Sequence, residues 1–373
     1  MNFFRKYSNQ ITGYLFITPA VLLISLFGIF PVFFGFYMSF HKWKVFKGRF
    51  LGFENYNRIL GDISSFWIFV LGLLCLIFSY WLWSEFKDKF KNKILLLIVS
   101  ILILLFALII INLSWSKMIL LGDDDFLKSI IYTFYYSFFT IFSEVGLGLI
   151  IAFALYQKLK GKQFFQMLLL LPYITPAVMG AAVFFIIFGK AENSLLNEFI
   201  GIFGFDPQLW LFDKRPITEV IFGVKIDGFL AGPSLALTSA ILYGIWSYTG
   251  YYAIILLAGL SIIPSDLYEA AKAEGASRWQ TFIKITIPLL MPIIFFLLLT
   301  GFINTFQAFN HIYVMQTSSA GDTMDVVTVE IFDHFWDRVK FGYAAAEGVV
   351  LFILLNVLAI SQYIFFRKRL NYD

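Results

Sequence analysis

Apolar residues along this chain gather into long runs that short polar segments separate. A helix needs about 20 apolar residues to cross the hydrocarbon core of a bilayer. Eight runs reach this length, at residues 14–40, 66–84, 94–113, 127–156, 165–189, 234–262, 289–310 and 344–366. The pattern predicts an all-α integral membrane protein with eight transmembrane helices. The first run is too long for a signal peptide and no small-residue cleavage site follows it, so we expect a retained anchor.

Lysine and arginine in the connections predict the orientation, because cytoplasmic loops carry the excess of positive charge. If the N-terminus lies inside, the segments 1–13, 85–93, 157–164, 263–288 and 367–373 are cytoplasmic. Together they hold 15 of the 28 basic residues: Arg5, Lys6, Lys87, Lys89, Lys91, Lys93, Lys158, Lys160, Lys162, Lys272, Arg278, Lys284, Arg367, Lys368 and Arg369. We therefore expect a multi-pass protein of the cell membrane with both termini in the cytoplasm.

The composition agrees with this class and narrows the chemistry. Hydrophobic residues make up 60% of the chain and charged residues only 14%, whereas a soluble domain has about 25% charged residues. The net charge of +4 is explained by topology and does not indicate nucleic-acid binding. Cys75 is the single cysteine, the three histidines are scattered, and no phosphate-binding loop motif occurs. We expect no metal, no bound cofactor and no catalytic activity in this chain.

The most informative segment runs from residue 263 to 292, between two predicted spans. Pro264 ends the preceding span, and Ser265 or Asp266 is placed to cap a helix that continues to about Glu274. Gly275 supplies the left-handed residue that stops this helix. A capping-box pattern, Ser277 to Gln280, starts the next one.

This second helix is expected to return toward the bilayer through Thr281–Ile287, with bends at Pro288 and Pro292. The segment is therefore predicted to form a rigid helix-turn-helix on the cytoplasmic face. Small side chains at Ala270, Ala271 and Ala273 would allow a partner to approach closely, and Glu269 would offer it a charge. The alternative is an amphipathic loop that lies on the lipid headgroups.

The segment resembles the EAA loop of ATP-binding-cassette (ABC) importer permeases. The resemblance rests on Glu269-Ala270-Ala271, Gly275, Ile285 and Pro288 at the expected spacings. Further similarity extends over most of 1–60 and 120–370, in Pro31 to Phe40, Leu51-Gly-Phe-Glu-Asn-Tyr56, Leu171-Pro-Tyr173, Pro176 and Phe341-Gly-Tyr-Ala344. The chain is similar to the binding-protein-dependent, maltose-type carbohydrate permeases.

Three features depart from the family pattern. Glu274 stands where the family usually has aspartate before the loop glycine, and Thr317-Ser-Ser-Ala-Gly321 replaces a Gly-Gly-Pro sequence. The runs 66–84 and 94–113 form a hairpin that adds to a six-span core. We accordingly divide the chain into a first core span with its outer loop (1–60), an inserted hairpin (61–120) and the remaining core (121–373).

The resemblance implies partners and a mechanical role. The EAA helix would dock into a groove of an ATP-binding subunit through Glu269, Ala270, Ala271 and Gly275. The assembly would contain two such subunits, which hold ATP and magnesium, a second permease subunit and an extracytoplasmic solute-binding protein. No residue of this chain would do chemistry.

Two polar patches in the spans beside the loop are candidates for the substrate pathway, because polar groups are costly at membrane depth. One comprises Trp246, Ser247, Tyr248 and Tyr251, of which the last three share a helical face. The other comprises Phe306, Gln307 and Asn310, with the two amides one helical turn apart. The resemblance places Ser247, Tyr248, Tyr251, Phe306, Gln307 and Asn310 close to sugar-contacting positions. The alternative is ordinary packing between helices.

Glu144 lies inside the run 127–156 and has four readings: a proton-coupling group, a protonated carboxyl, a carboxyl paired with a neighbouring helix, or one near a subunit contact. Other functions also remain open. The cargo could be another solute such as glycerol phosphate, although the core spans contain no lysine or arginine to bind an anion. An ion-coupled transporter or a membrane scaffold would leave the EAA loop unexplained.

Overall fold

The computed structural model describes residues 2–86, 93–157, 159–226 and 228–370. The predicted cytoplasmic residues Lys87, Lys89, Lys91 and Lys158 lie outside this part of the chain, as do the side chains of Arg5, Lys6, Arg367, Lys368 and Arg369. The chain divides into two units, residues 1–127 with 331–352 and residues 128–330 with 353–373.

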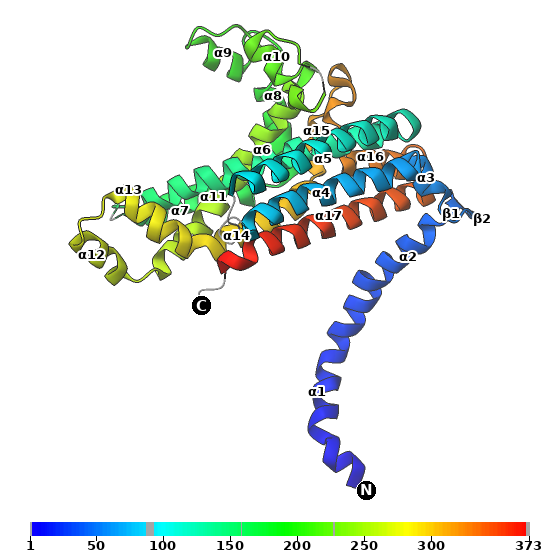
Figure 1. Cartoon of the computed structure of the whole chain (residues 1–373), viewed down its shortest axis with the longest axis horizontal. Coiled ribbons are helices and arrows are strands. Elements are labelled where there is room, and N and C mark those ends of the chain that lie inside the picture. Colours follow the sequence, from blue (N-terminus) through cyan, green and yellow to red (C-terminus); the bar gives the residue numbers. More distant parts are fainter. Residues whose placement is uncertain (1, 87–92, 158, 227, 371–373) are drawn as a thin grey trace. The chain divides into compact units, whose positions relative to one another are not determined.

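The described residues form a helical membrane protein (Figure 1). Seven helices are long and apolar enough to cross a bilayer: Thr12–Ser39, Ile63–Ser84, Lys93–Leu121, Asp124–Tyr156, Leu235–Ile262, Arg278–Phe306 and Phe341–Phe366. The pair Lys162–Ile174 and Ala177–Ile187 passes the same test together but is bent by 92°. The continuous span predicted at 165–189 is therefore wrong in shape, and the pair supplies an eighth span if it is counted as one.

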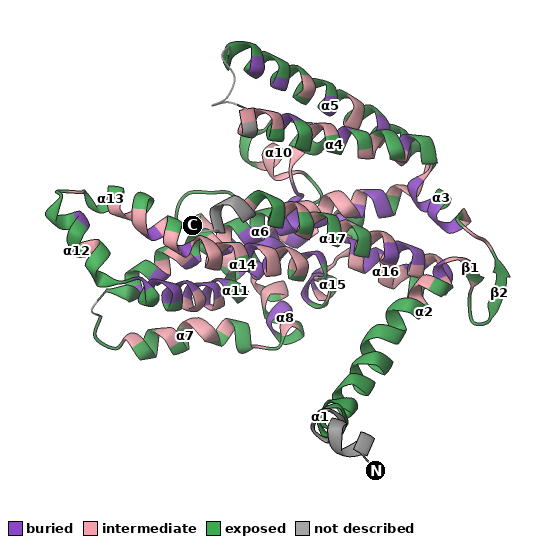
Figure 2. Ribbon diagram, turned by 60° about the horizontal axis from the view of Figure 1, so that its bottom comes forward, coloured by how far each residue is buried: buried purple, intermediate pink, exposed green. Residues whose placement is uncertain are grey.

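The first unit contains the N-terminal helices, a small hairpin of strands and a helical hairpin. Its elements are α1 (Asn2–Ile24), η1 (Ser25–Ile29), α2 (Phe30–Ser39), β1 (His41–Trp43), β2 (Lys47–Phe50), α3 (Glu54–Leu60), α4 (Ile63–Phe86) and α5 (Lys93–Leu121), with parts of α6 (Asp124–Tyr156), α16 (Val327–Trp336) and α17 (Phe341–Leu370). Strands β1 and β2 pair antiparallel, with His41 opposite Phe50. Along Thr12–Phe34 of α1, η1 and α2, every side chain is exposed, so this apolar surface requires lipid or a partner (Figure 2).

Helices α4 and α5 form the predicted hairpin and pack side by side (Figure 1). The Ser79 hydroxyl donates to the Ser100 carbonyl at 2.7 Å, which satisfies a polar group between the two helices. Near the start of α4 and the end of α5, Lys117 and Asp62 form an ion pair at 2.6 Å. The Asp123 amide also donates to the Ile59 carbonyl, so the two ends of the hairpin lie together.

The second unit is built around α11 (Leu235–Ile262), whose side chains are mostly buried (Figure 2). The remaining elements are α7 (Lys162–Ile174), α8 (Ala177–Ile187), α9 (Leu195–Gly201), η2 (Trp210–Phe212), α10 (Ile217–Phe222), η3 (Gly228–Ala231), α12 (Ser265–Ala273), α13 (Arg278–Thr281), η4 (Phe282–Thr286), α14 (Ile287–Phe306), α15 (Asn310–Met315) and η5 (Ser318–Met324). The predicted loop 190–233 contains four of these short helices. The Trp210 indole donates to Asn197 at 2.7 Å and links two of them.

Close helix contact at Gly250 fixes the crossing of α11 and α7. A Cβ atom at this position would overlap the carbonyl oxygen of Leu169, so only glycine allows the two backbones to approach this closely. Tyr173 and Tyr251, on the same two helices, stack with ring centroids 4.6 Å apart. Small residues commonly provide such contacts between membrane helices.

Two of the prolines inside long helices, Pro31 and Pro288, follow a wide π turn, and the helix continues through each of them. The turn η1 (Ser25–Ile29) ends two residues before Pro31, and η4 (Phe282–Thr286) ends two residues before Pro288. A π turn lets the backbone amide bond five residues back, which makes room for a ring that would clash with the preceding turn of an α-helix. The helix after the EAA break is therefore not a short one. It continues from Arg278 to Phe306 as part of a span.

Candidate functional site

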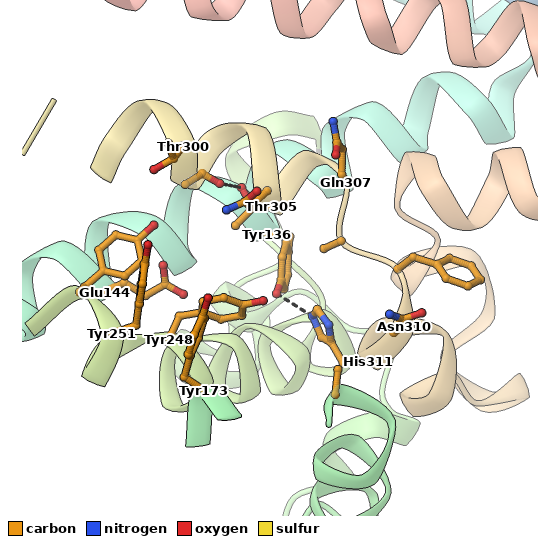
Figure 3. A pocket seen from close by; sticks show the side chains of 16 residues that line it. Tyr136, Glu144, Tyr173, Tyr248, Tyr251, Thr300, Thr305, Gln307, Asn310 and His311 are labelled. Carbon is orange, nitrogen blue, oxygen red and sulfur yellow. Dashed lines mark hydrogen bonds between the residues drawn. The ribbon is translucent and has the colours of Figure 1, made fainter. Parts of the chain in front are cut away.

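A cavity of about 340 Å³ lies in the second unit, bordered by two interruptions of helical structure (Figure 3). Tyr173 and Ala177 flank the break between α7 and α8, and both line the cavity. The second interruption, at 307–309, separates α14 from α15 and also lines it. Backbone that leaves the helix at membrane depth is tolerated where it borders a cavity, which accounts for both breaks occurring here.

One side of the cavity is a wall of tyrosine rings. Tyr251 stacks on Tyr173 at an interplanar angle of 15°, and Tyr248 meets Tyr173 edge-on at a centroid distance of 5.5 Å. Tyr173 comes from α7 and the other two from successive turns of α11 (Figure 3). The wall offers flat apolar faces with hydroxyl groups at their edges.

The opposite side carries amide groups from the end of α14 and the start of α15. Asn304, Gln307 and Asn310 are exposed, and their side chains have no hydrogen-bond partner among the described residues. Each amide therefore has both donors and acceptors available to a ligand. No lysine or arginine belongs to the described lining of the cavity.

His311 closes one end of the cavity and has a fixed role in packing. Its Nε2 lies 2.7 Å from the Tyr136 hydroxyl, and its ring stacks against Tyr243 at 5.0 Å (Figure 3). Burial lowers the pKa of His311 to about 4, so the imidazole is neutral at physiological pH. A neutral ring can exchange one hydrogen bond with Tyr136 but places no positive charge in the cavity.

Glu144, from the middle of α6, also lines the cavity and is only 2% exposed. The Tyr252 hydroxyl is a hydrogen-bonding neighbour of its carboxyl group.

The EAA-like segment has the local structure that the sequence predicts after its first turn. Gly275 has φ +77°, and the Ala276 amide donates to the Ala271 carbonyl at 2.9 Å, which closes the end of α12. The Ser277 amide donates to the Gln280 side chain at 2.8 Å, and the Gln280 amide donates back to the Ser277 hydroxyl. The prediction for the start of α12 is wrong. Pro264 is the N-cap residue, and no side chain caps the helix.

A cluster in the first unit has the side chains of a possible metal site: Asp123, His334 and Glu347 lie with ligand atoms within 4.8 Å of one another. Two hydrogen bonds and one short acid–base contact connect these groups to one another and to their neighbours. Arg338 lies 2.8 Å from Nε2 of His334, Nδ1 lies 2.9 Å from Glu347, and the Tyr343 hydroxyl donates to Asp123 at 2.6 Å. Burial lowers the pKa of His334 to about 4. Because the Arg338 guanidinium can only donate, Nε2 of His334 accepts and a neutral ring carries its proton on Nδ1, beside Glu347.

A family model described as binding-protein-dependent transport system inner membrane component matches residues 144–372. This chain belongs to that family. The matched residues contain the EAA-like loop and most of the residues that line the cavity. Both features therefore lie in the part of the chain that the family model describes.

Two relatives and one solved structure extend the comparison. The trehalose/maltose transport system permease protein MalF of Thermococcus litoralis is 25% identical over 352 residues, which cover 94% of this chain and 92% of the relative. The arabinooligosaccharides transport system permease protein AraP of Bacillus subtilis is 29% identical over 242 residues, or 64% and 71% of the two chains. A chain from the crystal structure of a bacterial ABC transporter for the acidic polysaccharide alginate has a TM-score of 0.55 and 21% identity, covering 78% and 99%. This last likeness shows the fold.

The structure of this inner membrane component brings together four of the seven residues predicted for the substrate pathway. Tyr248, Tyr251, Gln307 and Asn310 line the cavity. The prediction that Gln307 and Asn310 are one turn apart on a single helix is wrong, because α14 ends at Phe306 and the chain leaves the helix before Asn310.

The other three residues of that set contact neighbouring side chains, and Trp246 is 41% exposed. Trp246 lies against Phe184 with ring centroids 4.8 Å apart, Ser247 is buried beside Tyr243, and Phe306 is buried at the end of α14. None of the three belongs to the described cavity lining.

Sequence reasoning missed other members of the site. The sequence pattern does not single out Tyr252, Asn304 or His311, and it indicates Tyr173 only through the family resemblance. Tyr252 and Asn304 carry the same signal as the residues that were chosen, a polar side chain in an apolar run. The contribution of Tyr173 depends on how α7 crosses α11, which the linear pattern does not contain.

The residues predicted to contact an ATP-binding subunit also separate by exposure. Glu269, Ala270 and Gly275 are exposed. Ala271, also in α12, is buried. The Tyr268 hydroxyl lies 3.2 Å from the Thr286 hydroxyl and ties α12 to the helix that follows. This contact holds α12 against the helix Arg278–Phe306, which follows the loop.

Proposed function

We propose that this chain is a permease subunit of an ABC importer that carries a sugar, mono- or oligosaccharide, into the cell. A second permease subunit completes the pathway and an extracytoplasmic binding protein delivers the sugar. Two ATP-binding subunits, which hold the ATP and magnesium, supply the work, and this chain itself catalyses nothing. The sugar named for each of the two relatives supports a carbohydrate cargo.

One observation carries the proposal: the EAA-like loop joins two of the helices that line the cavity. Helix α11 carries Tyr251 and ends at Ile262, directly before α12. The helix Arg278–Phe306 leads from the loop back to Gln307. From Tyr251 to Ile262 the distance along the helix axis is about 17 Å. A movement of α12 therefore reaches the cavity walls through two continuous helices.

The chemistry of the cavity fits an uncharged polyol. The tyrosine faces offer apolar surfaces on which sugar rings stack, and the three available amides offer donors and acceptors to hydroxyl groups. A volume of about 340 Å³ lies within the range of small-molecule sites. Glycerol phosphate, the alternative cargo, would enter without a lysine or arginine to compensate its charge.

The proposed topology places both termini and the loop 263–292 in the cytoplasm and counts α7 with α8 as one broken span. Glu269, Ala270 and Gly275 then face an ATP-binding subunit, and Ala271 supports the helix from inside. Closure of the two ATP-binding subunits shifts the docked helices, and the spans move from inward-facing to outward-facing. The hairpin 66–113 is an addition to the six-span core.

Ion-coupled transporters also contain broken spans and buried carboxyl groups. This chain has both, in α7 with α8 and in Glu144. That reading leaves α12 without a purpose, because a capped, exposed helix with Glu269 and Ala270 has no role in a single-chain transporter. Coupling to an external motor accounts for the cavity and the loop together.

The complex reconstituted in vesicles with its ATP-binding subunits and binding protein tests the proposal. A ligand screen on the binding protein identifies the sugar, and uptake of that sugar should require internal ATP. Tyr251→Ala should lower uptake at least tenfold with assembly unchanged, because the stacked wall loses its centre. Tyr363→Ala, an exposed tyrosine on α17, is the matched control and should transport normally.

Two outcomes would contradict the proposal. Solute movement by this chain in vesicles that lack any nucleotide-hydrolysing subunit would show that no motor is needed. Normal uptake by Tyr251→Ala would remove the cavity from the pathway and leave the tyrosines in a packing role.

A further inference from the structure

Glu144 is the single acidic residue in the described lining of a cavity that otherwise presents hydroxyl, amide and aromatic groups. It enters from α6, while the tyrosine wall comes from α7 and α11 and the amides from α14 and α15 (Figure 3). A polyol in the cavity would therefore lie against a lining that includes this carboxyl group.

The carboxyl group is only partly satisfied by the protein. Its neighbour is the Tyr252 hydroxyl, whereas Oε1 has no hydrogen-bond partner among the described residues. The residue is 2% exposed and belongs to the cavity lining, so Oε1 is shielded from bulk water at the cavity wall. Buried polar atoms without a partner are uncommon in native proteins, and each one calls for an explanation such as a ligand.

Packing alone does not account for a carboxyl group at this position. Glutamine would preserve the shape and a hydrogen bond to Tyr252, and leucine would avoid the cost of burying a polar group. The neighbouring turn of α6 fits closely against α11, since a Cβ at Gly148 would lie 3.0 Å from the Cβ of Tyr252. Glu144 is thus held in place by helix contact and directed at the cavity.

We propose that Oε1 of Glu144 accepts a hydrogen bond from a donor group of the transported sugar, a hydroxyl or an ammonium group. The cavity would then select neutral and amino sugars over sugars that carry a carboxylate or phosphate. An anionic cargo would meet an acidic group and no compensating cation, and a buried charge without a partner is strongly unfavourable. The inference rests on the proposed function, because it assigns the substrate class of the same cavity.

The test is direct binding to the purified complex, held outward-facing by an ATP analogue and without binding protein, so that only the permease cavity selects. The probes are three matched sets of disaccharides built on glucose, galactose and arabinose, together with the sugar found in the ligand screen. Each set contains the neutral sugar and, where the ring allows it, its amino and uronic acid forms. Wild type should bind at least one neutral or amino form, and bind the matching uronate at least tenfold more weakly.

Two variants separate charge from shape. Glu144→Gln keeps the size and one acceptor, so we expect neutral sugars to bind within about threefold of wild type while the penalty against the uronate falls about tenfold. Glu144→Leu removes the acceptor and should weaken neutral and amino sugars about tenfold or more. Tyr252→Phe removes the neighbouring hydroxyl, together with its hydrogen bond to the Leu297 carbonyl at 3.4 Å, and should keep the discrimination. Glu192→Gln, an exposed glutamate in the same unit, is the matched control.

The outcomes distinguish this inference from the proposed function. If wild type binds sugars but both Glu144 variants keep wild-type affinities and discrimination, Glu144 serves only Tyr252 and the inference is overturned. Tighter binding of a uronate than of its neutral counterpart by wild type would also overturn it. If no sugar binds at all, the cavity is not a sugar site and both proposals fail. Should Glu144→Leu not assemble, Glu144→Gln decides the question, because it preserves shape.

Discussion

Replacing Gly250 by alanine would test the helix crossing on which the cavity depends. The added Cβ would overlap the carbonyl oxygen of Leu169 and lie 2.6 Å from its carbonyl carbon. Both atoms belong to helical backbone, so no change of side-chain rotamer relieves the contact. Helices α7 and α11 would have to separate by about 1 Å or more, since inserted groups in a packed interior force backbone shifts.

The size of the effect follows from two contributions. Overpacking of this kind costs about 1–3 kcal/mol. The stacked pair of Tyr173 and Tyr251 spans the same two helices, and its loss adds about 0.5–1.5 kcal/mol. We therefore expect Gly250→Ala to destabilise the second unit by about 2–4 kcal/mol and to reduce sugar uptake, because the separation opens the tyrosine wall.

Thermal unfolding of the purified complex and ATP-driven uptake measure the two effects. Gly146→Ala is the matched control, because it lies on a helix with no other atom within 4 Å of an added Cβ. It should match or slightly exceed wild-type stability, since alanine is the better helix former. A Gly250→Ala complex that melts and transports like wild type would show that α7 and α11 do not cross at this point, and the reasoning would fail.

Four further predictions follow from other features. Glu269→Ala should leave ATP hydrolysis and assembly intact but reduce uptake, measured as sugar moved per ATP; unchanged coupling would remove Glu269 from the docking surface. Gly275→Ala should strain the end of α12 by about 1–2 kcal/mol, because φ is +77°, and should also lower coupling, whereas normal coupling would show that the turn tolerates a side chain. The pKa of His311 is lowered to about 4 from about 6.5, so stability should fall as pH drops below 6.5, by about 2 kcal/mol at pH 5, and His311→Gln should flatten the melting profile over this range. Excising 62–121 and joining Gly61 to Gly122 should preserve insertion and assembly, detected by chromatography of the complex, because the ends of the hairpin lie together; loss of the complex would make the hairpin part of the core.

Hydropathy and local capping signals predicted much of this structure. Long apolar runs located the spans to within a few residues at most ends, because the length needed to cross a bilayer leaves little freedom. Gly275 and the pair Ser277 and Gln280 located the end of α12 and the start of the next helix, because these residues act through backbone bonds within one turn.

The prolines show where the sequence was insufficient. Pro31, Pro288 and Pro176 all lie in or beside apolar runs, yet only the last coincides with a sharp break. The residue before it, Thr175, has ψ 130°, the extended conformation that proline favours in its neighbour. At the other two positions a π turn keeps the helix continuous, and this choice depends on packing around each proline.

The cavity was predictable only in part for a related reason. Tyr248 and Tyr251 share a helix, so their common face could be read from spacing. Tyr173, Asn304 and Glu144 come from three other helices, and their meeting depends on crossings such as the one at Gly250. Gln307 and Asn310 lie at the two ends of the break between α14 and α15, so they do not share one helical face.

The π turn at Phe282–Thr286 shifts the angular phase of the span that follows the EAA loop. An α-helix advances about 100° per residue, so one extra residue in a turn rotates everything on one side of it by about that angle. Trp279, before the turn, and the residues of α14, after it, therefore obey two different helical wheels. A designer who grafts this loop onto a related permease must carry the whole segment through Pro288, or the grafted helix will present the wrong face to its neighbours.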